Sequence, residues 1–328
     1  MSLVSSLNIG ISALDAFSQG MQLISNNIAN VNTTGYKDAR PNYTDSFSNI
    51  LRQSAPAPSS GNGSNTPPVQ IGAGVQLGSI TTEFTQGTLS STGVNTDLAV
   101  SGSGFFTVRD PASGTSYVTR AGNFSIDSQG YLVTSQGYRV QGLSDGGATY
   151  TATNNNGALS YAETPVAPAT VGDIKIDFST SVGNGLTNNT GGAFTDAQVN
   201  AGAPTLQSFT VDTAGNVVIG LSNGDTVDRG KVLLQNFSSP NALTKAGNNL
   251  YTGFAAAGPI GGTTLSASNN GAGTNGLGSI QVGALELSNV DLSQEMTNII
   301  VAERSFQSAS RIVTVTDTML QDVVDLKH

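Results

Sequence analysis

The sequence predicts an α+β protein in which long helices at both ends of the chain flank a middle made of β-structure. Apolar residues near the N-terminus recur at alternating steps of three and four, and a similar stripe lies near the C-terminus. Such steps place side chains in a narrow seam on one helix face, which is the pattern of a coiled coil. Between the stripes, short apolar alternations are interrupted by glycine turns. We therefore expect terminal helices that form a coiled-coil-like layer, a mainly β domain, and a second β domain inserted in it.

Residues 1–35 are predicted to contain the N-terminal helix, running from residue 3 to about residue 32. Asp15 is the only charged residue before Lys37, so the surface of this helix is almost uncharged. Gly35 is expected to follow the helix as a left-handed C-cap. The seam consists of one glycine and eight apolar residues: Leu3, Leu7, Gly10, Leu14, Phe17, Met21, Ile24, Ile28 and Val31.

Composition divides the middle of the chain. Residues 36–70 are polar and become rich in Pro and Ser, which predicts a linker or an extended arm. Residues 71–143 together with 230–287 are predicted to form the first β domain, and residues 144–229 the inserted outer β domain. Turn-forming clusters predict hairpin loops at Asp127–Gly130, Ala214–Asn216 and Asn223–Gly224.

Residues 288–328 are predicted to contain the C-terminal helix. Asp291 can serve as its N-cap, with Gln294 at the third helical position completing a pair that resembles a capping box. Its apolar stripe consists of Leu292, Met296, Ile299, Phe306, Val313, Leu320 and Val324, of which all but Val324 are assigned to the interface between copies.

The C-terminal stripe is weaker than the N-terminal one. Polar residues occupy positions where a strict heptad requires apolar ones, namely Glu303, Ser310 and Asp317. A neighbouring row of residues, here called the track, follows the 3.6-residue repeat of a helix and continues the stripe where these polar residues interrupt it. It consists of Ala302, Ala309 and Thr316.

The two stripes predict an interface between copies of the chain. The β region offers no long apolar partner helix, so the helices pair with each other, with neighbouring copies, or both. About eight buried apolar side chains contribute at most roughly 15–20 kcal/mol. Ordering about 30 residues costs about 1–2 kcal/mol each. We therefore expect both ends to be poorly ordered in the isolated monomer and helical in an assembly. Asp15 either pairs with Arg304 or Arg311 across the helices or is solvated.

Composition excludes several functions. Charged residues make up 11% of the chain and the net charge is −9, which disfavours binding to nucleic acid or to anionic membranes. There is no Cys and the single His is His328, so the chain lacks the residues that a Ser-His-Asp catalytic triad or a His-based zinc site requires. We expect no enzyme, cofactor, metal or membrane-inserted segment. The first residues also lack the basic and apolar regions of a secretory signal peptide.

Several motifs resemble those of the bacterial flagellar rod and hook proteins. The segment from Ser25 to Lys37, SNNIANVNTTGYK, closely resembles the N-terminal signature of that family. Similar motifs follow in order along nearly the whole chain, except at about 144–205. They are Phe84–Gly87, Asp97–Val100 with Gly104–Phe106, Thr119–Phe124, Gly247–Tyr251 and Gly283–Asp291.

The resemblance implies a structural subunit that assembles into a helical tube. The inserted β domain with Asp173–Asp177 resembles that of hook proteins, and so do residues 283–286, 288–292, 300–304 and 306–308. We therefore expect a subunit of the flexible, extracellular flagellar hook, which transmits motor torque to the filament. The Pro- and Ser-rich residues 52–70 and the residues after them resemble an extra segment of the distal rod, which keeps a distal-rod subunit of the basal body as the alternative. A secreted adhesin-like β-protein is a third interpretation.

The resemblance also implies partners. The family's terminal helices form an inner tube around an export channel, and its β domains form outer layers whose sliding contacts allow bending. The implied partners are further copies of this chain, the flagellar rod, the hook cap, the hook–filament junction proteins and the flagellar type III export apparatus.

Overall fold

The computed structural model consists of two compact units. The first contains both terminal helices and residues 37–83, and the second contains residues 84–289 with the short stretch 32–36. A mainly β unit and two long terminal helices confirm the predicted mixture of helix and strand. The described residues are 3–54, 65–144, 149–155, 158–164, 170–176, 187–188, 205–222, 224, 226–262 and 264–326.

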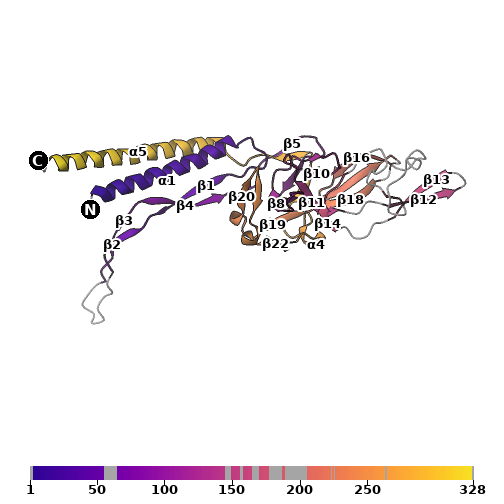
Figure 1. The fold of residues 1–328 in the computed structure, drawn as a ribbon, viewed down its shortest axis with the longest axis horizontal. Coiled ribbons are helices and arrows are strands. Elements are labelled where there is room, and N and C mark those ends of the chain that lie inside the picture. The colour runs from indigo at the N-terminus through magenta and orange to yellow at the C-terminus, as the bar shows by residue number, and fades with distance from the viewer. Residues whose placement is uncertain are drawn as a thin grey trace. The chain divides into compact units, whose positions relative to one another are not determined.

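The two long helices belong to the first unit, where α1 (Leu3–Ala29) and α5 (Leu292–Asp325) pack against each other (Figure 1). α1 ends a few residues before the expected position. Gly35 does adopt the predicted left-handed conformation, with φ of 68°. A Cβ atom there would lie 2.6 Å from the backbone nitrogen of Ala121, so only glycine fits.

Residues within 36–70, predicted to be a linker or an extended arm, contribute to an antiparallel hairpin in the first unit. β1 (Ala39–Asp45) pairs with β4 (Val75–Thr82), and β2 (Ser48–Arg52) pairs with β3 (Val69–Gly72). The Tyr43 ring of β1 packs edge-to-face on Phe17 of α1, with ring centroids 5.7 Å apart. Because the hairpin packs on α1, residues 71–83 belong with the helices and not with the β unit.

The second unit is built on one large sheet. The path of hydrogen-bonded neighbours runs β16-β17-β18-β11-β7-β8-β21-β20. These strands are β16 (Leu206–Val211), β17 (Asn216–Leu221), β18 (Thr226–Val232), β11 (Arg139–Ser144), β7 (Phe105–Arg109), β8 (Ser116–Thr119), β21 (Leu250–Thr252) and β20 (Thr244–Gly247).

Shorter elements surround this path. Strands that branch from it are β9 (Ser125–Ile126), β10 (Leu132–Val133), β14 (Thr170–Asp173), β19 (Leu234–Phe237) and β22 (Pro259–Ile260). Separate ladders join β5 (Leu89–Ser91) to β24 (Ala284–Glu286), β6 (Leu98–Ser101) to β23 (Ser279–Val282), and β12 (Thr149–Asn155) to β13 (Ala158–Thr164) and β15 (Thr187–Asn188). Short helical turns are η1 (Pro240–Ala242), α3 (Phe254–Ala257) and α4 (Ala267–Asn270).

The predicted boundary of an inserted β domain does not coincide with a break between compact units. β18 pairs directly with β11, so the meander of β16, β17 and β18 continues the same sheet as β7. Many residues between 145 and 204 lie outside the described part of the chain. A separate outer domain at 144–229 therefore stays a prediction for those residues.

Two of the predicted hairpin loops are formed and each is organised by an aspartate, whereas Asn223 of the third loop lies outside the described residues. Asp127 accepts hydrogen bonds from the backbone N–H groups of Gln129 and Tyr131 between β9 and β10. Asp212 accepts in the same way from Ala214 and Asn216 between β16 and β17. A short carboxylate that binds its own downstream backbone stabilises a tight turn. β17 and β18 also pair, as the Asn-Gly signal predicts.

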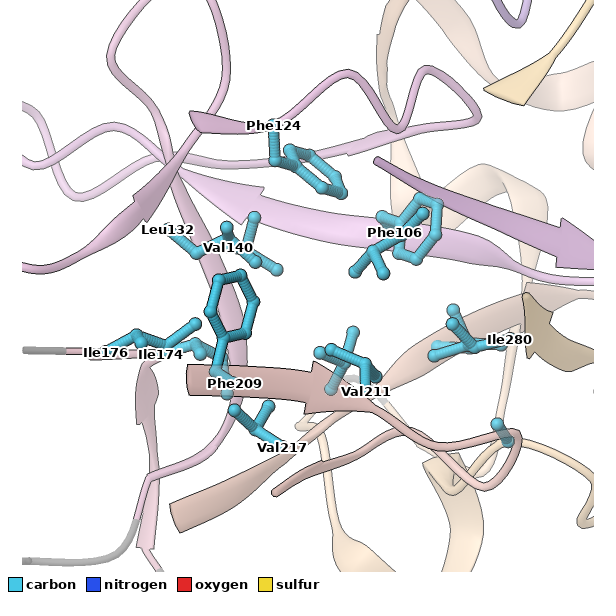
Figure 2. Packing of buried hydrophobic residues seen from close by; sticks show 14 of the residues in the cluster. Phe106, Phe124, Leu132, Val140, Ile174, Ile176, Phe209, Val211, Val217 and Ile280 are labelled. Carbon is cyan, nitrogen blue, oxygen red and sulfur yellow. The ribbon is translucent and has the colours of Figure 1, made fainter. Parts of the chain in front are cut away.

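Alternating residues of β7 face two cores. Phe106 and Val108 belong to the larger core, in which Phe106 packs edge-to-face on Phe124 with centroids 5.2 Å apart. Figure 2 shows these rings across the interior from Phe209 and Val211 of β16. On the opposite side, Phe105 belongs to a smaller aromatic cluster with Phe237 and Tyr251. Because successive side chains of a strand point to opposite faces, β7 contributes side chains to both cores.

A buried ion pair holds together segments of the second unit that are distant in sequence. Arg120 and Glu286 lie 3.3 Å apart, and their side chains are 4% and 0% exposed. Glu286 also accepts from the N–H of Gly87, and its backbone carbonyl accepts from the N–H of Gly35. Arg120 donates to the carbonyl of Gly102. The pair therefore fixes the entry and exit segments of this unit on one another.

Within the described residues, none of the helices combines the length and apolar character needed to cross a membrane.

Candidate assembly interface

The contact between α1 and α5 is lined by small residues on α5. The buried residues of α5 are spaced by seven: Glu295, Ala302, Ala309 and Thr316. On α1, Gly10 is buried, and a Cβ atom added there would lie 2.8 Å from Cγ2 of Val313. Small side chains allow the two backbones to approach closely. The track that repaired the weak C-terminal stripe is thus the one that faces α1.

A polar network closes one end of this contact. Asn27 of α1 is fully buried, and its amide donates to Asp38 at 2.6 Å, to the carbonyl of Ala39 at 2.8 Å and to Glu295 at 3.4 Å. Its carbonyl oxygen accepts from the N–H of Ala39. Asn298 donates to Glu295 at 3.0 Å. One amide therefore connects α1, the start of β1 and the first turn of α5, and buried polar groups of this kind require such partners.

The predicted cap of the C-terminal helix is half confirmed. The Asp291 carboxylate accepts from the backbone N–H groups of Ser293 and Gln294, as an N-cap does. The side chain of Gln294 donates instead to Asn298 one turn further on. Within the described residues, the reciprocal bond of a capping box, between Gln294 and Asp291, is therefore not formed.

Most of the predicted stripe residues are half-buried, and Val313 faces Gly10 of α1. Ile24 is buried, whereas Leu292 and Met296 are 44% and 45% exposed. The half-buried residues are Leu7, Leu14, Phe17, Met21, Ile28, Val31, Ile299, Phe306, Val313 and Leu320. Leu3 lies in α1, but its side chain is not among those described. Their role in contacts between copies stays a prediction.

A second apolar stripe on α5, here called the outer stripe, was not predicted from the sequence. Its positions advance by three or four and comprise Val301, Ser305, Ser308, Ile312, Val315, Met319, Val323 and Leu326. The six apolar members are 50–86% exposed. At 100° per residue this stripe lies about 60–100° around the helix from the track that faces α1. It therefore flanks the contact between the helices, and Cγ2 of its member Ile312 lies 3.7 Å from the position that a Cβ atom would take at Gly10. Testing other helical frames for the same periodicity would have found it.

The predicted ion pair between the helices is not formed within the described chain. Asp15 accepts a hydrogen bond from Gln19, four residues along α1, at 3.2 Å. Arg304 donates to Gln307, and the described ion pairs include neither Arg304 nor Arg311. All three charged side chains are exposed. An exposed Asp15 agrees with the alternative of a solvated carboxylate.

A groove of about 320 Å³ opens beside the first half of the outer stripe. Phe17 and Ile24 of α1, Tyr43 of β1, and Val301 and Ser305 of α5 contribute to its lining. Burial raises the pKa of Tyr43. The lining is mainly apolar, which suits an apolar side chain. Within the described residues, no group of His, Cys, Asp or Glu is arranged to hold a metal ion.

Known proteins match the chain along most of its length. The family described as "Flagellar hook protein FlgE/F/G D1 domain" matches residues 99–219. The one described as "Flagellar basal body rod FlgEFG protein C-terminal" matches residues 281–326, and "Flagella basal body rod protein" matches residues 7–37.

Individual relatives include both rod and hook proteins. The flagellar basal-body rod protein FlgG of Bacillus subtilis is 36% identical over 98% of this chain and 99% of its own length. The FlgG protein of Caulobacter vibrioides is 31% identical over 98% of both chains. The flagellar hook protein FlgE of Treponema pallidum is 43% identical, but over 42% of this chain and 29% of its own length.

Full-length similarity to rod proteins, together with the three matched families, agrees with the paired terminal helices and the β unit between them. The chain therefore belongs to the family of flagellar hook and rod axial proteins, as a structural component of the flagellum and not an enzyme.

Proposed function

We propose that this chain is a subunit of the flagellar rod, and that copies associate through α1 and α5 into a helical tube. The observation that supports this proposal most directly is the outer stripe. Six apolar side chains that are half exposed or more lie along one stripe of α5, interrupted by Ser305 and Ser308, and an exposed apolar surface of this kind indicates an interaction site.

The free energies of burial and association favour assembly through many contacts over a single contact. Burying six half-exposed apolar side chains contributes roughly 5–9 kcal/mol. Association of two proteins costs an estimated 4–15 kcal/mol in lost translational and rotational freedom. A single contact along the outer stripe would therefore be weak. A tube, in which every subunit contacts several neighbours, is stable.

Two observations favour the rod over the hook that the sequence suggested. Among the matches over the full length of both chains, the two rod relatives are 36% and 31% identical, whereas the flagellar hook protein FlgE of Borreliella burgdorferi is 28% identical. In addition, the segment that resembles an extra part of the distal rod contributes to the hairpin of β1, β2, β3 and β4, in which β1 and β4 pack along α1. A hairpin braced on the helix layer restricts bending of that layer.

A hook subunit is the second candidate, because the identity to the Treponema hook protein, 43%, exceeds that to the rod relatives. For either subunit we propose other rod and hook proteins as neighbours and export by the flagellar type III apparatus.

Electron microscopy of purified, assembled protein tests the proposal. We expect straight, stiff tubes. Curved or supercoiled tubes would establish the hook candidate instead. Protein that forms no tubes at any concentration, while its circular dichroism shows a folded chain, would overturn both candidates.

A further inference from the structure

We propose that the second half of α5 in one copy packs, parallel and displaced along the helix axis, on the first half of α5 in the next copy. The occupant of the groove is therefore a second copy of this chain. This inference rests on the proposed assembly into a tube and deepens it, because it names the two surfaces that meet.

The two halves of the outer stripe differ in size. The first half is Val301, Ser305, Ser308 and Ile312, with two small serines and the groove of about 320 Å³ beside it. The second half is bulky and exposed, with Val315, Met319, Val323 and Leu326 between 50% and 86% exposed. Bulky side chains fit into the hollow of the first half, whereas two second halves would leave the groove empty.

The spacing of the stripe permits this overlap. A displacement of two heptads carries Val301 onto Val315, Ser305 onto Met319 and Ile312 onto Leu326. Positions that repeat every seven residues stay on the same face of a helix that pairs with a partner. The second half of one helix can therefore occupy the seam that the first half of the next helix presents.

Charge also distinguishes the two halves. The first half carries the exposed residues Arg304 and Arg311, and Arg40 lies at the groove. The second half carries Asp322 and Asp325, and the last turn of α5 has no basic residue. Overlap of the first half with the second half brings opposite charges together. Overlap of two first halves would bring Arg304 and Arg311 close to their own copies.

The two surfaces are different parts of one helix, so the contact is heterologous. A heterologous contact that does not close on itself produces an open helical polymer, whereas an antiparallel pair of α5 helices would satisfy both halves at once and stop at a dimer. The proposal therefore predicts growth in a single direction along the displaced helices.

Disulfide cross-linking tests the contact, because the chain has no Cys of its own. Ser305→Cys and Met319→Cys are introduced together. Within one chain they are about 21 Å apart along the helix, which exceeds the reach of a disulfide, about 7 Å between Cα atoms. Oxidation of assembled protein should give a ladder of dimers, trimers and longer covalent chains on a non-reducing gel.

The matched control is Glu303→Cys with Asp317→Cys, which has the same spacing on another exposed face of α5 and should give no ladder. Covalent material that stops at dimers would establish the antiparallel pair and overturn the proposal. Tubes in the microscope without a ladder would overturn it while the proposed function stands. A chain that forms neither tubes nor a ladder overturns both.

A bulky substitution gives a second measurement that needs no oxidation. Ser305→Trp fills the groove and should raise the concentration needed for assembly at least tenfold, whereas Glu303→Trp on the other face should leave it within about twofold. Equal effects of the two substitutions would overturn the proposal.

Discussion

At the scale of single residues, buried polar groups decide which segments meet. Asn27 and Glu286 are both 0% exposed, and each connects three separate segments. Apolar contacts are tolerant of small shifts, whereas a buried amide or carboxylate is satisfied only in one arrangement. These groups therefore select the native arrangement of each unit more sharply than the surrounding core does.

Replacing Asn27 by Leu should destabilise the first unit. The substitution leaves Asp38 and Glu295 buried without the amide that donates to both, so the free energy of unfolding should fall by about 2–5 kcal/mol. Urea unfolding of the full chain, followed by far-ultraviolet circular dichroism, measures the change. Gln22→Leu, at an exposed position of α1, is the control and should change the stability by less than about 0.5 kcal/mol. Equal stability of both variants would contradict the assigned role.

Asp173 should make the stability of the second unit depend on acid pH. Burial alone would raise its pKa, but hydrogen bonds from Gln141 and Arg139 and the charge of Arg109 outweigh burial, so the pKa is lowered. A lowered pKa in the folded state stabilises the protein above the unfolded pKa of about 3.9, and this stabilisation is lost as the pH falls through the folded pKa.

The melting temperature of the wild type should therefore fall below pH 4, by about 2–4 °C for each kcal/mol lost. Asp173→Asn should melt at a lower temperature than the wild type at neutral pH, and its melting temperature should fall less on acidification. Asp228→Asn, at an exposed position of β18, should follow the wild type. A parallel acid decline in all three proteins would show that Asp173 does not contribute.

At the scale of elements, the pair of α1 and α5 depends on small residues. Ala309 is 3% exposed and faces α1. Ala309→Leu forces the helices apart and should cost about 1–3 kcal/mol of stability. Thr314→Leu, at an exposed position one turn further on, should be nearly neutral. Thermal unfolding followed by helical circular dichroism compares them, and a larger loss in the Thr314 variant would contradict the observed seam.

The outer stripe predicts a separation of folding from assembly. Met319 is 50% exposed, so Met319→Asp should leave both helices folded while tubes no longer form at concentrations that suffice for the wild type. Thr314→Asp places the same charge on another exposed face and should assemble normally. Sedimentation of polymer and circular dichroism of the soluble fraction are the two measurements. Normal tubes from Met319→Asp would refute the interface.

At the scale of the whole molecule, low charge suits repeated contacts between copies. Charged residues make up 11% of the chain, against about 25% in typical soluble domains. Neutral polar groups lose less hydration free energy on burial than charged groups do. Such contacts can be numerous and individually weak, as a polymer of identical subunits requires.

The expected disorder of both ends in the isolated monomer stays a prediction. The sequence-based estimate counted only burial along one helix. The structure adds the contact with α5 and the hairpin of β1 and β4 on α1. Circular dichroism of dilute monomer distinguishes the two cases, because full helicity would show that these contacts suffice.

The sequence by itself determined the features that depend on neighbouring residues. The Asp291 cap, the turns organised by Asp127 and Asp212, and the two terminal helices follow from local hydrogen bonding and from periodicity. The motif-bearing segment around Asn27 also pointed to the family. Each of these signals is complete within a few turns of chain, so no tertiary contact is needed to read it.

Only the tertiary structure decided which helix face meets which partner. Several frames of α5 carry apolar residues, and the frame buried against α1 is the one with small residues. Gly10 of α1 leaves room for the Val313 side chain, which a Cβ atom there would meet at 2.8 Å. The bulkier outer stripe stays exposed on the flank of this contact. The hairpin likewise depends on pairing residues more than thirty positions apart, such as Ala39 with Thr82. Periodicity shows that a helix has an apolar face, but the shape of the partner decides which face is used.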